Sequence, residues 1–141
     1  MGDLTKQIAI NAPVQAVFSY IANPYTAPTY VTAITRVVAG PEVATAVGQR
    51  WQAHVNFLGR QTVLWLRLTE FEALRSVRFA MESEPNAVLT LRLAARDAAH
   101  TDVAMTLEVP SVPNILLAGV MNNVLASNMD MLKRAVESTP A

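Results

Sequence analysis

The sequence predicts an α+β fold in which an antiparallel sheet wraps around one long C-terminal helix and leaves room for an internal apolar cavity. Residues 111–138 read as a single helix that is apolar around most of its circumference. A helix of this kind is usually buried on most sides. Most of the chain before it alternates between apolar and polar residues in short runs, as strands do. Strands that precede one apolar helix indicate a sheet folded around that helix.

Two elements open the chain before the main run of strands. Residues 5–10 alternate as a short strand, and the segment Asn11-Ala12-Pro13 then begins a helix, with proline in its first turn. Apolar residues recur at helical spacing up to Ile21, and Asn23-Pro24 ends the helix because a residue before proline avoids the α region. Residues 25–31 are too short and too interrupted for a long helix, so a turn of helix or a loop is expected there.

The central part of the chain carries the strand patterns. Residues 51–57 give the cleanest alternation, with one apolar and one polar face. The links between runs are short, which favours antiparallel neighbours. The middle of one run, residues 63–68, is apolar on both faces. The expected strands are residues 34–38, 51–57, 61–71, 77–82, 89–94 and 102–108.

Composition limits the function classes. The 141 residues fit a single domain, residues 1–141, with 52% apolar and 16% charged residues. Charged residues usually make up about 25% of a chain, so this one packs very fully, forms an oligomer or lines a cavity with apolar side chains. Eleven basic residues balance eleven acidic ones, and without a basic run nucleic acid is not expected as a partner. Zero net charge and the doubly apolar strand lead us to expect self-association, most simply a homodimer.

The chain contains no cysteine and only two histidines, His54 and His100. Disulfides and thiolate chemistry are therefore excluded, and neither a metal centre nor a cofactor is expected. Residues 1–7 lack the apolar core of a signal peptide. The longest apolar run, residues 115–121, is far shorter than the roughly 18 residues of a membrane span. We expect a soluble, cytoplasmic protein with no membrane span.

Three motifs resemble the START-like, or SRPBCC, superfamily, and most closely its polyketide cyclase/dehydrase and lipid-transport group. The resemblance covers essentially the whole chain, although motifs of this kind inform on fold more than on function. They are Ile8-x-Ile10-x-Ala12-Pro13-x-x-x-Val17-Phe18-x-Tyr20-Ile21-Ala22-Asn23-Pro24, Val47-Gly48-x-x-Trp51 and Leu132-Lys133-x-x-Val136-Glu137.

The resemblance implies a helix-grip fold, in which a curved sheet grips the C-terminal helix over an apolar cavity. Related proteins include lipid carriers, plant pathogenesis-related binders, coenzyme Q-binding proteins, aromatase/cyclases and ring-hydroxylating oxygenase domains. The oxygenase branch is disfavoured because its non-haem iron needs a His-rich ligand set that this chain lacks.

Aromatic side chains are the first candidates for a ligand-binding site. Trp51, Phe57 and Phe79 lie on the apolar faces of their strands, where they either form the cavity wall or pack as ordinary core. Trp65 belongs to the doubly apolar strand and faces either the cavity or a subunit interface. Tyr30 lies in the segment that the resemblance places near the cavity mouth, where its hydroxyl could donate a hydrogen bond to a ligand carbonyl.

The long helix adds the remaining candidates. Asn122 shares a helical stripe with Leu125 and Met129, and this stripe should face the sheet. A buried amide needs partners, which a ligand, a trapped water or a strand side chain could provide. Asn123 and Asn128 are expected on other sides of the helix. His54 and Arg67 are more simply explained as residues of the outer sheet face.

Three functions remain open. One is binding of a hydrophobic small molecule, such as a lipid, isoprenoid, quinone or polyketide-like compound, with Tyr30, Trp51, Phe57, Trp65, Phe79, Asn122, Leu125 and Met129 as its site. The alternative is a polyketide cyclase/dehydratase-type enzyme that positions its substrate and polarises a carbonyl group. A protein-interaction role is the third. No catalytic residue is assigned, because the sequence contains no recognisable catalytic set.

Overall fold

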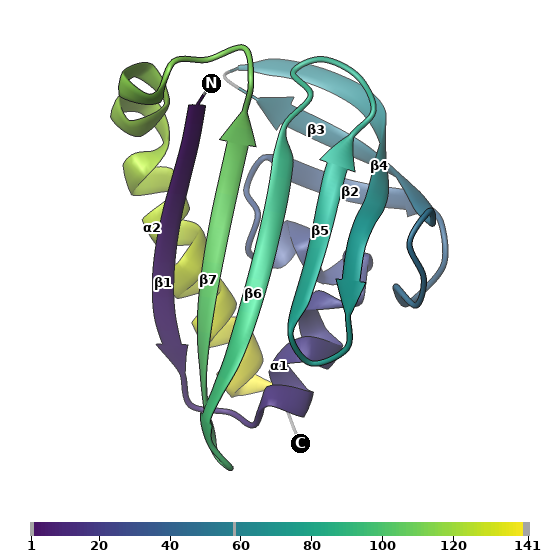
Figure 1. Cartoon of the computed structure of the whole chain (residues 1–141). Helices are drawn as coiled ribbons and strands as arrows, with labels where there is room; N and C mark the ends of the chain where they lie inside the picture. Colours follow the sequence, from purple (N-terminus) through teal and green to yellow (C-terminus); the bar gives the residue numbers. More distant parts are fainter. Residues whose placement is uncertain (1, 58, 140–141) are drawn as a thin grey trace.

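Among the described residues of the computed structural model, 2–57 and 59–139, seven strands form one antiparallel sheet. Their order across the sheet is β1-β7-β6-β5-β4-β3-β2, so the first strand of the chain pairs with the last. The sheet curves, and every helix lies on its inner side (Figure 1). The strands are β1 (Gly2–Ile10), β2 (Ile34–Ala39), β3 (Arg50–Phe57), β4 (Arg60–Glu72), β5 (Ser76–Met81), β6 (Val88–Asp97) and β7 (His100–Val109).

Three helical elements cover the inner face. They are α1 (Val14–Ile21), the 3-10 helix η1 (Pro24–Thr29) and α2 (Asn114–Ser138). The longest, α2, runs along β1 and also contacts α1 and η1 (Figure 1). The segment for which the sequence predicted a turn of helix or a loop is therefore η1, which begins with the side chain of Asn23 accepting a hydrogen bond from the Tyr25 N–H at 3.0 Å. The helix-grip fold predicted from the sequence is confirmed.

The strand predictions also hold, with longer bounds at the edge of the sheet. β1 begins at Gly2 rather than at residue 5, because Gly2 pairs with Val109 and the ladder continues to Ile10 opposite Thr101. Thr101 is fully buried, and its hydroxyl donates to the Ala12 carbonyl at 2.8 Å. This bond ties the link between β1 and α1 to β7.

One face of α2 is buried, which corrects the expectation that the helix is covered on most sides. Its buried residues recur at spacings of three and four, as one stripe does on a helix of 3.6 residues per turn. The sheet covers this stripe from one side only, and the opposite side of the helix faces solvent. The buried residues are Leu117, Met121, Leu125, Asn128, Met129, Leu132 and Val136.

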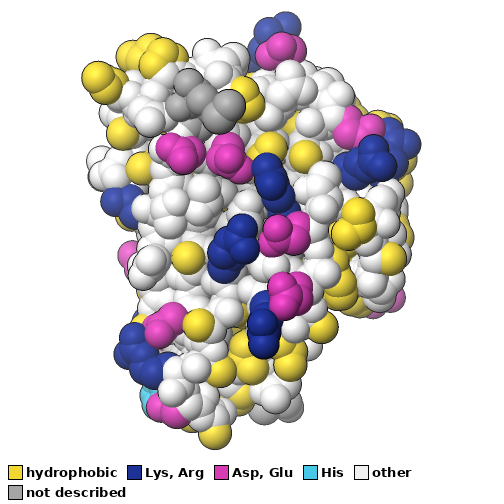
Figure 2. All heavy atoms as spheres, in the orientation of Figure 1, with side chains coloured by type: hydrophobic (Ala, Val, Ile, Leu, Met, Phe, Trp, Pro, Cys, Tyr) yellow, Lys and Arg dark blue, Asp and Glu magenta, His cyan; other side chains and the backbone are white. Residues whose placement is uncertain are grey.

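The first turns of α2 differ from the prediction. The helix begins at Asn114 rather than at residue 111, with Pro113 as N-cap and no side chain that caps it. Ile115, Leu116 and Val120 are 86%, 59% and 53% exposed, and yellow side chains gather in this region at the upper left of Figure 2. By length and composition alone α2 could cross a membrane, but its stripe of buried residues identifies it here as the core helix of the sheet.

The outer face of the sheet is polar. Arginine and acidic side chains alternate across it in Figure 2. Exposed ion pairs of this kind contribute little to stability, typically about 0–1 kcal/mol each, but their charges make this face hydrophilic. An apolar cavity is therefore expected on the inner face. The pairs, with their nitrogen–oxygen distances, are Arg50–Glu82 (2.7 Å), Arg78–Glu108 (3.4 Å), Arg92–Glu70 (3.5 Å) and Arg96–Asp102 (2.7 Å).

Candidate functional site

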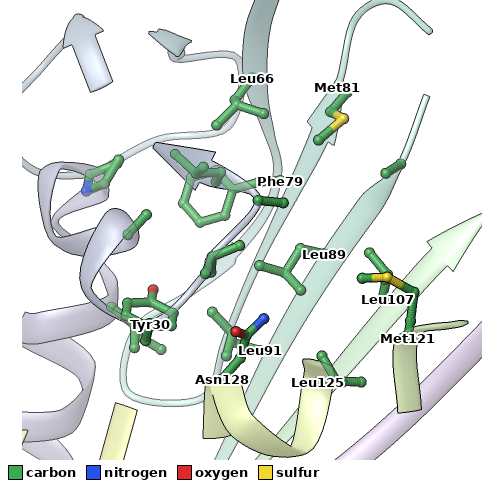
Figure 3. A pocket seen from close by; sticks show the side chains of 17 residues that line it. Tyr30, Leu66, Phe79, Met81, Leu89, Leu91, Leu107, Met121, Leu125 and Asn128 are labelled. Atoms are coloured by element: carbon green, nitrogen blue, oxygen red, sulfur yellow. The ribbon is translucent and has the colours of Figure 1, made fainter. Parts of the chain in front are cut away.

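An apolar cavity lies between the inner face of the sheet, η1 and the middle of α2 (Figure 3). Strand register explains how its sheet wall forms. Leu66 lies opposite Met81 on β4 and β5, while Leu89 lies opposite both Phe79 and Leu107. Side chains directly opposite each other in a sheet point to the same face. The sheet wall consists of Leu66, Phe79, Met81, Leu89, Leu91 and Leu107, and α2 contributes Met121, Leu125 and Asn128.

The cavity is narrow in this conformation. Its volume is 60 Å³, whereas pockets that enclose drug-sized ligands measure about 300–1,000 Å³. Its walls include two methionines, Met81 and Met121, whose unbranched side chains adopt several shapes at little cost. A ligand larger than a few water molecules can enter only if side chains such as these move aside.

Tyr30 presents a free donor to this cavity. The residue is 2% exposed, and its ring lies 6.1 Å from the ring of Tyr20. Every fully covered side-chain nitrogen or oxygen in the described part of the chain has a hydrogen-bond partner, but no described residue bonds the Tyr30 hydroxyl. The hydroxyl oxygen must therefore touch open space, and the open space beside Tyr30 is the cavity (Figure 3).

The protonation state of Tyr30 follows from its burial. Desolvation raises the pKa of this phenol above its ordinary value of 10.0, with a smaller contribution from the nearby Tyr20. Burial in a medium of low dielectric disfavours the charged phenolate. Tyr30 is therefore a neutral donor at every physiological pH.

Asn128 is the second polar group of the cavity and is 4% exposed. Its amide nitrogen faces three acceptors, which are the Tyr30 carbonyl at 3.0 Å, the Thr32 hydroxyl at 3.2 Å and the Val124 carbonyl at 3.3 Å. The opposite placement would put the amide oxygen against two carbonyl oxygens, which it would repel. Asn128 thus joins α2 to the segment that carries Tyr30.

Five of the eight sequence-predicted residues lie on the inner side of the sheet, in the cavity lining or in the core beside it. Tyr30, Phe79 and Leu125 line the cavity. Trp51 is fully buried immediately behind this wall, with its ring 5.7 Å from that of Phe79 and its indole N–H bonded to the Pro41 carbonyl. Met129 is buried in the core without reaching the cavity.

Two candidates lie elsewhere, and one is outside the described side chains. Trp65 is half-buried on the outer face, where the Arg50 guanidinium carbon lies 4.5 Å from its ring centroid. Asn122 is exposed, so its predicted place on the sheet-facing stripe is wrong. Asn128, which was expected on another side, occupies that stripe instead. Phe57 ends β3, but its side chain lies outside the part of the chain that the structure describes.

The signal for Asn128 was present in the sequence. It follows Leu125 by three residues and precedes Leu132 by four, so it shares the helical spacing of the buried stripe. Asn122 also lies three residues from Leu125, in the other direction. Helical spacing alone is compatible with either residue on the buried stripe. In the structure Asn122 lies beyond the edge of the helix face that the sheet covers.

No charged side chain lines the cavity in residues 2–57 and 59–139. Across the same residues, no three histidine, aspartate or glutamate side chains gather closely enough to hold a metal ion. Chemistry available at the cavity therefore consists of apolar burial, one neutral donor at Tyr30 and the amide of Asn128.

The comparisons with known proteins agree with this geometry. Residues 1–137 match the family described as polyketide cyclase / dehydrase and lipid transport. The chain belongs to this family. A comparison with curated proteins gives no match.

Solved structures show that this member of the family shares its fold with other proteins. The Zhui aromatase/cyclase from Streptomyces sp. R1128 is 15% identical, with a TM-score of 0.73 over 96% of this chain and 93% of that one. A START superfamily protein from Mycobacterium smegmatis is 12% identical, with a TM-score of 0.76 over 97% and 98%. The di-domain ARO/CYC BexL is 20% identical, with a TM-score of 0.73 over 97% of this chain and 47% of that one. At these identities the likeness is one of fold.

Proposed function

We propose that the protein binds a hydrophobic small molecule in the cavity between the sheet and α2. The observation that carries the proposal is a wall of buried and half-buried leucine, methionine and phenylalanine side chains with a free donor, Tyr30, among them. Binding in such a site draws mainly on apolar burial, worth about 25 cal/mol per Å² before the costs of association. The family, which includes lipid transport, supports the same reading.

Native mass spectrometry of the purified protein tests this proposal. We expect a bound, hydrophobic organic compound that is released on unfolding. Leu89→Phe, which extends a side chain into the cavity, should remove the compound at a cost in stability of about 1–3 kcal/mol. Val63→Phe is the matched control, because Val63 is 50% exposed on β4 and outside the cavity. A wild-type protein that carries no compound and binds no apolar fluorescent probe would refute the proposal.

A cyclase/dehydratase-type activity is the second candidate, and the free hydroxyl of Tyr30 favours it. A buried, neutral donor can stabilise the negative charge that develops on a carbonyl oxygen during ring closure. Aromatase/cyclases occur among the structures with this fold. In this case the cavity would fold a reactive chain, and catalysis would depend on positioning more than on ionisable groups.

The two functions predict different behaviour of Tyr30→Phe. For an enzyme, turnover of a polyketide analogue should fall by about 10²-fold or more while binding survives. Tyr20→Phe is the control, because the Tyr20 hydroxyl bonds Thr29 at 2.6 Å and lies outside the cavity lining. Full turnover by Tyr30→Phe would remove this residue from the mechanism. Tight binding by wild type without any turnover would leave binding as the function.

A further inference from the structure

The polar inventory of the cavity restricts the ligand's chemistry. The lining contains no lysine, arginine, histidine, aspartate or glutamate among the described residues. A charge that is moved from water into such a space without a partner costs several kcal/mol. An anionic or cationic group therefore has no counter-charge inside this cavity.

The two polar side chains of the cavity differ in which hydrogen-bonding group they can present to a ligand. The Asn128 nitrogen is committed to the Tyr30 and Val124 carbonyls and the Thr32 hydroxyl. The Asn128 oxygen that remains is an acceptor, which repels a carboxylate or phosphate oxygen. Tyr30 is the reverse case, because its hydroxyl carries a proton and no described residue accepts it. A ligand acceptor would complete the hydrogen bonding of Tyr30.

We propose that the cavity selects a neutral carbonyl compound, with its ketone oxygen bonded to the Tyr30 hydroxyl, and rejects carboxylates. The ketone oxygen accepts a hydrogen bond from the Tyr30 hydroxyl. A ketone has no hydrogen-bond donor of its own that would need a further partner in the cavity. The proposal rests on the proposed binding function and adds the chemical class of the ligand and the residue that selects it. It separates neutral ketones from fatty-acid-like anions, which an apolar cavity alone would not do.

Three rigid probes of nearly equal shape test this selectivity. They are methyl naphthyl ketone, isopropenylnaphthalene and naphthoate, all substituted at the same ring carbon. The isopropenyl group replaces the ketone oxygen by a methylene group, and the carboxylate replaces the methyl group by a charged oxygen. Rigid probes are needed because a long-chain acid could leave its head group in water while its tail enters. Dissociation constants come from methyl NMR titrations at pH 7 with wild type, Tyr30→Phe and Tyr20→Phe.

We expect Tyr30→Phe to weaken binding of the ketone by about 3–10-fold, the range of one neutral hydrogen bond. Binding of isopropenylnaphthalene should change by less than about twofold, which also verifies that the variant keeps its cavity. Tyr20→Phe should alter neither. Naphthoate should bind wild type at least about 100-fold more weakly than the ketone, because its charge is buried without a partner.

Distinct outcomes overturn the two proposals. If Tyr30→Phe changes ketone and hydrocarbon binding equally, or if naphthoate binds as tightly as the ketone, the selectivity proposal is wrong while binding in the cavity stands. If none of the three probes binds wild type, the proposed function fails and the selectivity proposal fails with it. A thermal unfolding curve for each variant verifies that the titrations compare folded proteins.

Discussion

Trp51→Ala is expected to lower the free energy of unfolding by about 3–5 kcal/mol, the usual cost of removing a fully buried tryptophan. Trp51 is 0% exposed, and its ring meets Phe79 edge-on at 5.7 Å. Its indole N–H donates to the Pro41 carbonyl at 2.5 Å, so truncation also leaves that carbonyl without its donor. Denaturant titration measures the loss.

Two further variants check this interpretation. Trp51→Phe keeps a ring but not the N–H, so its loss should be smaller than that of Trp51→Ala. Trp65→Ala is the matched control, because Trp65 is half-buried on the outer face beneath Arg50. A loss below about 1 kcal/mol for Trp51→Ala would mean that Trp51 does not anchor the wall behind Phe79.

The second large effect is expected for Asn128→Asp, which keeps the shape of the side chain and removes its donor. The new carboxyl oxygen would face the Tyr30 and Val124 carbonyl oxygens, 3.0 Å and 3.3 Å from the present nitrogen. Burial beside these oxygens disfavours the carboxylate and raises its pKa in the folded state. A pKa raised by about two, at about 1.36 kcal/mol per unit, lowers the free energy of unfolding by about 3 kcal/mol at pH 7.

The sign of the pH dependence identifies the cause. The folded-state pKa of the introduced carboxyl lies above its unfolded value of about 3.9. The stability of the variant is therefore greatest below about pH 4 relative to wild type, where the carboxyl is protonated in both states, and is lost as the pH rises through the folded-state pKa. Denaturant titrations at acidic and neutral pH measure this.

Asn123→Asp provides the control for the same substitution on an exposed position of the same helix. It should be nearly neutral at both pH values, within about 0.5 kcal/mol. Equal losses for Asn123→Asp and Asn128→Asp, or a loss at Asn128 that does not depend on pH, would contradict the buried amide contact between α2 and residues 30–32.

Strand faces could be predicted from the sequence because alternation and burial share one period. Residues 51–57 alternate, and the structure buries Trp51, Ala53 and Val55 while His54 stays exposed. Where a strand is apolar on both faces the pattern loses this information. On β4, Leu64 and Leu66 face inward and Val63 and Trp65 outward, which the register with β3 and β5 decides and the residues of β4 alone do not.

The candidate site was less predictable, for two physical reasons. The apolar surface of α2 is wider than the stripe that the sheet covers, so the sequence alone did not determine which part of that surface is buried. Asn122 was therefore predicted on the stripe, where the structure places Asn128. The cavity itself depends on how side chains from five strands and three helical elements meet, and its volume is only about 60 Å³. Sequence patterns can predict which residues form the wall of such a cavity, but they cannot predict how wide the cavity is.

The two tryptophans give the protein a built-in optical contrast. Trp51 lies in a dry environment beside Phe79, whose other side faces the cavity, whereas Trp65 lies on the outer face beneath a cationic guanidinium group. Emission from Trp51 therefore responds to changes in the cavity wall, while Trp65 contributes a background that soluble quenchers can reach. In Trp65→Phe the remaining tryptophan fluorescence comes from Trp51 alone, so occupancy of the cavity can be followed without attaching a label.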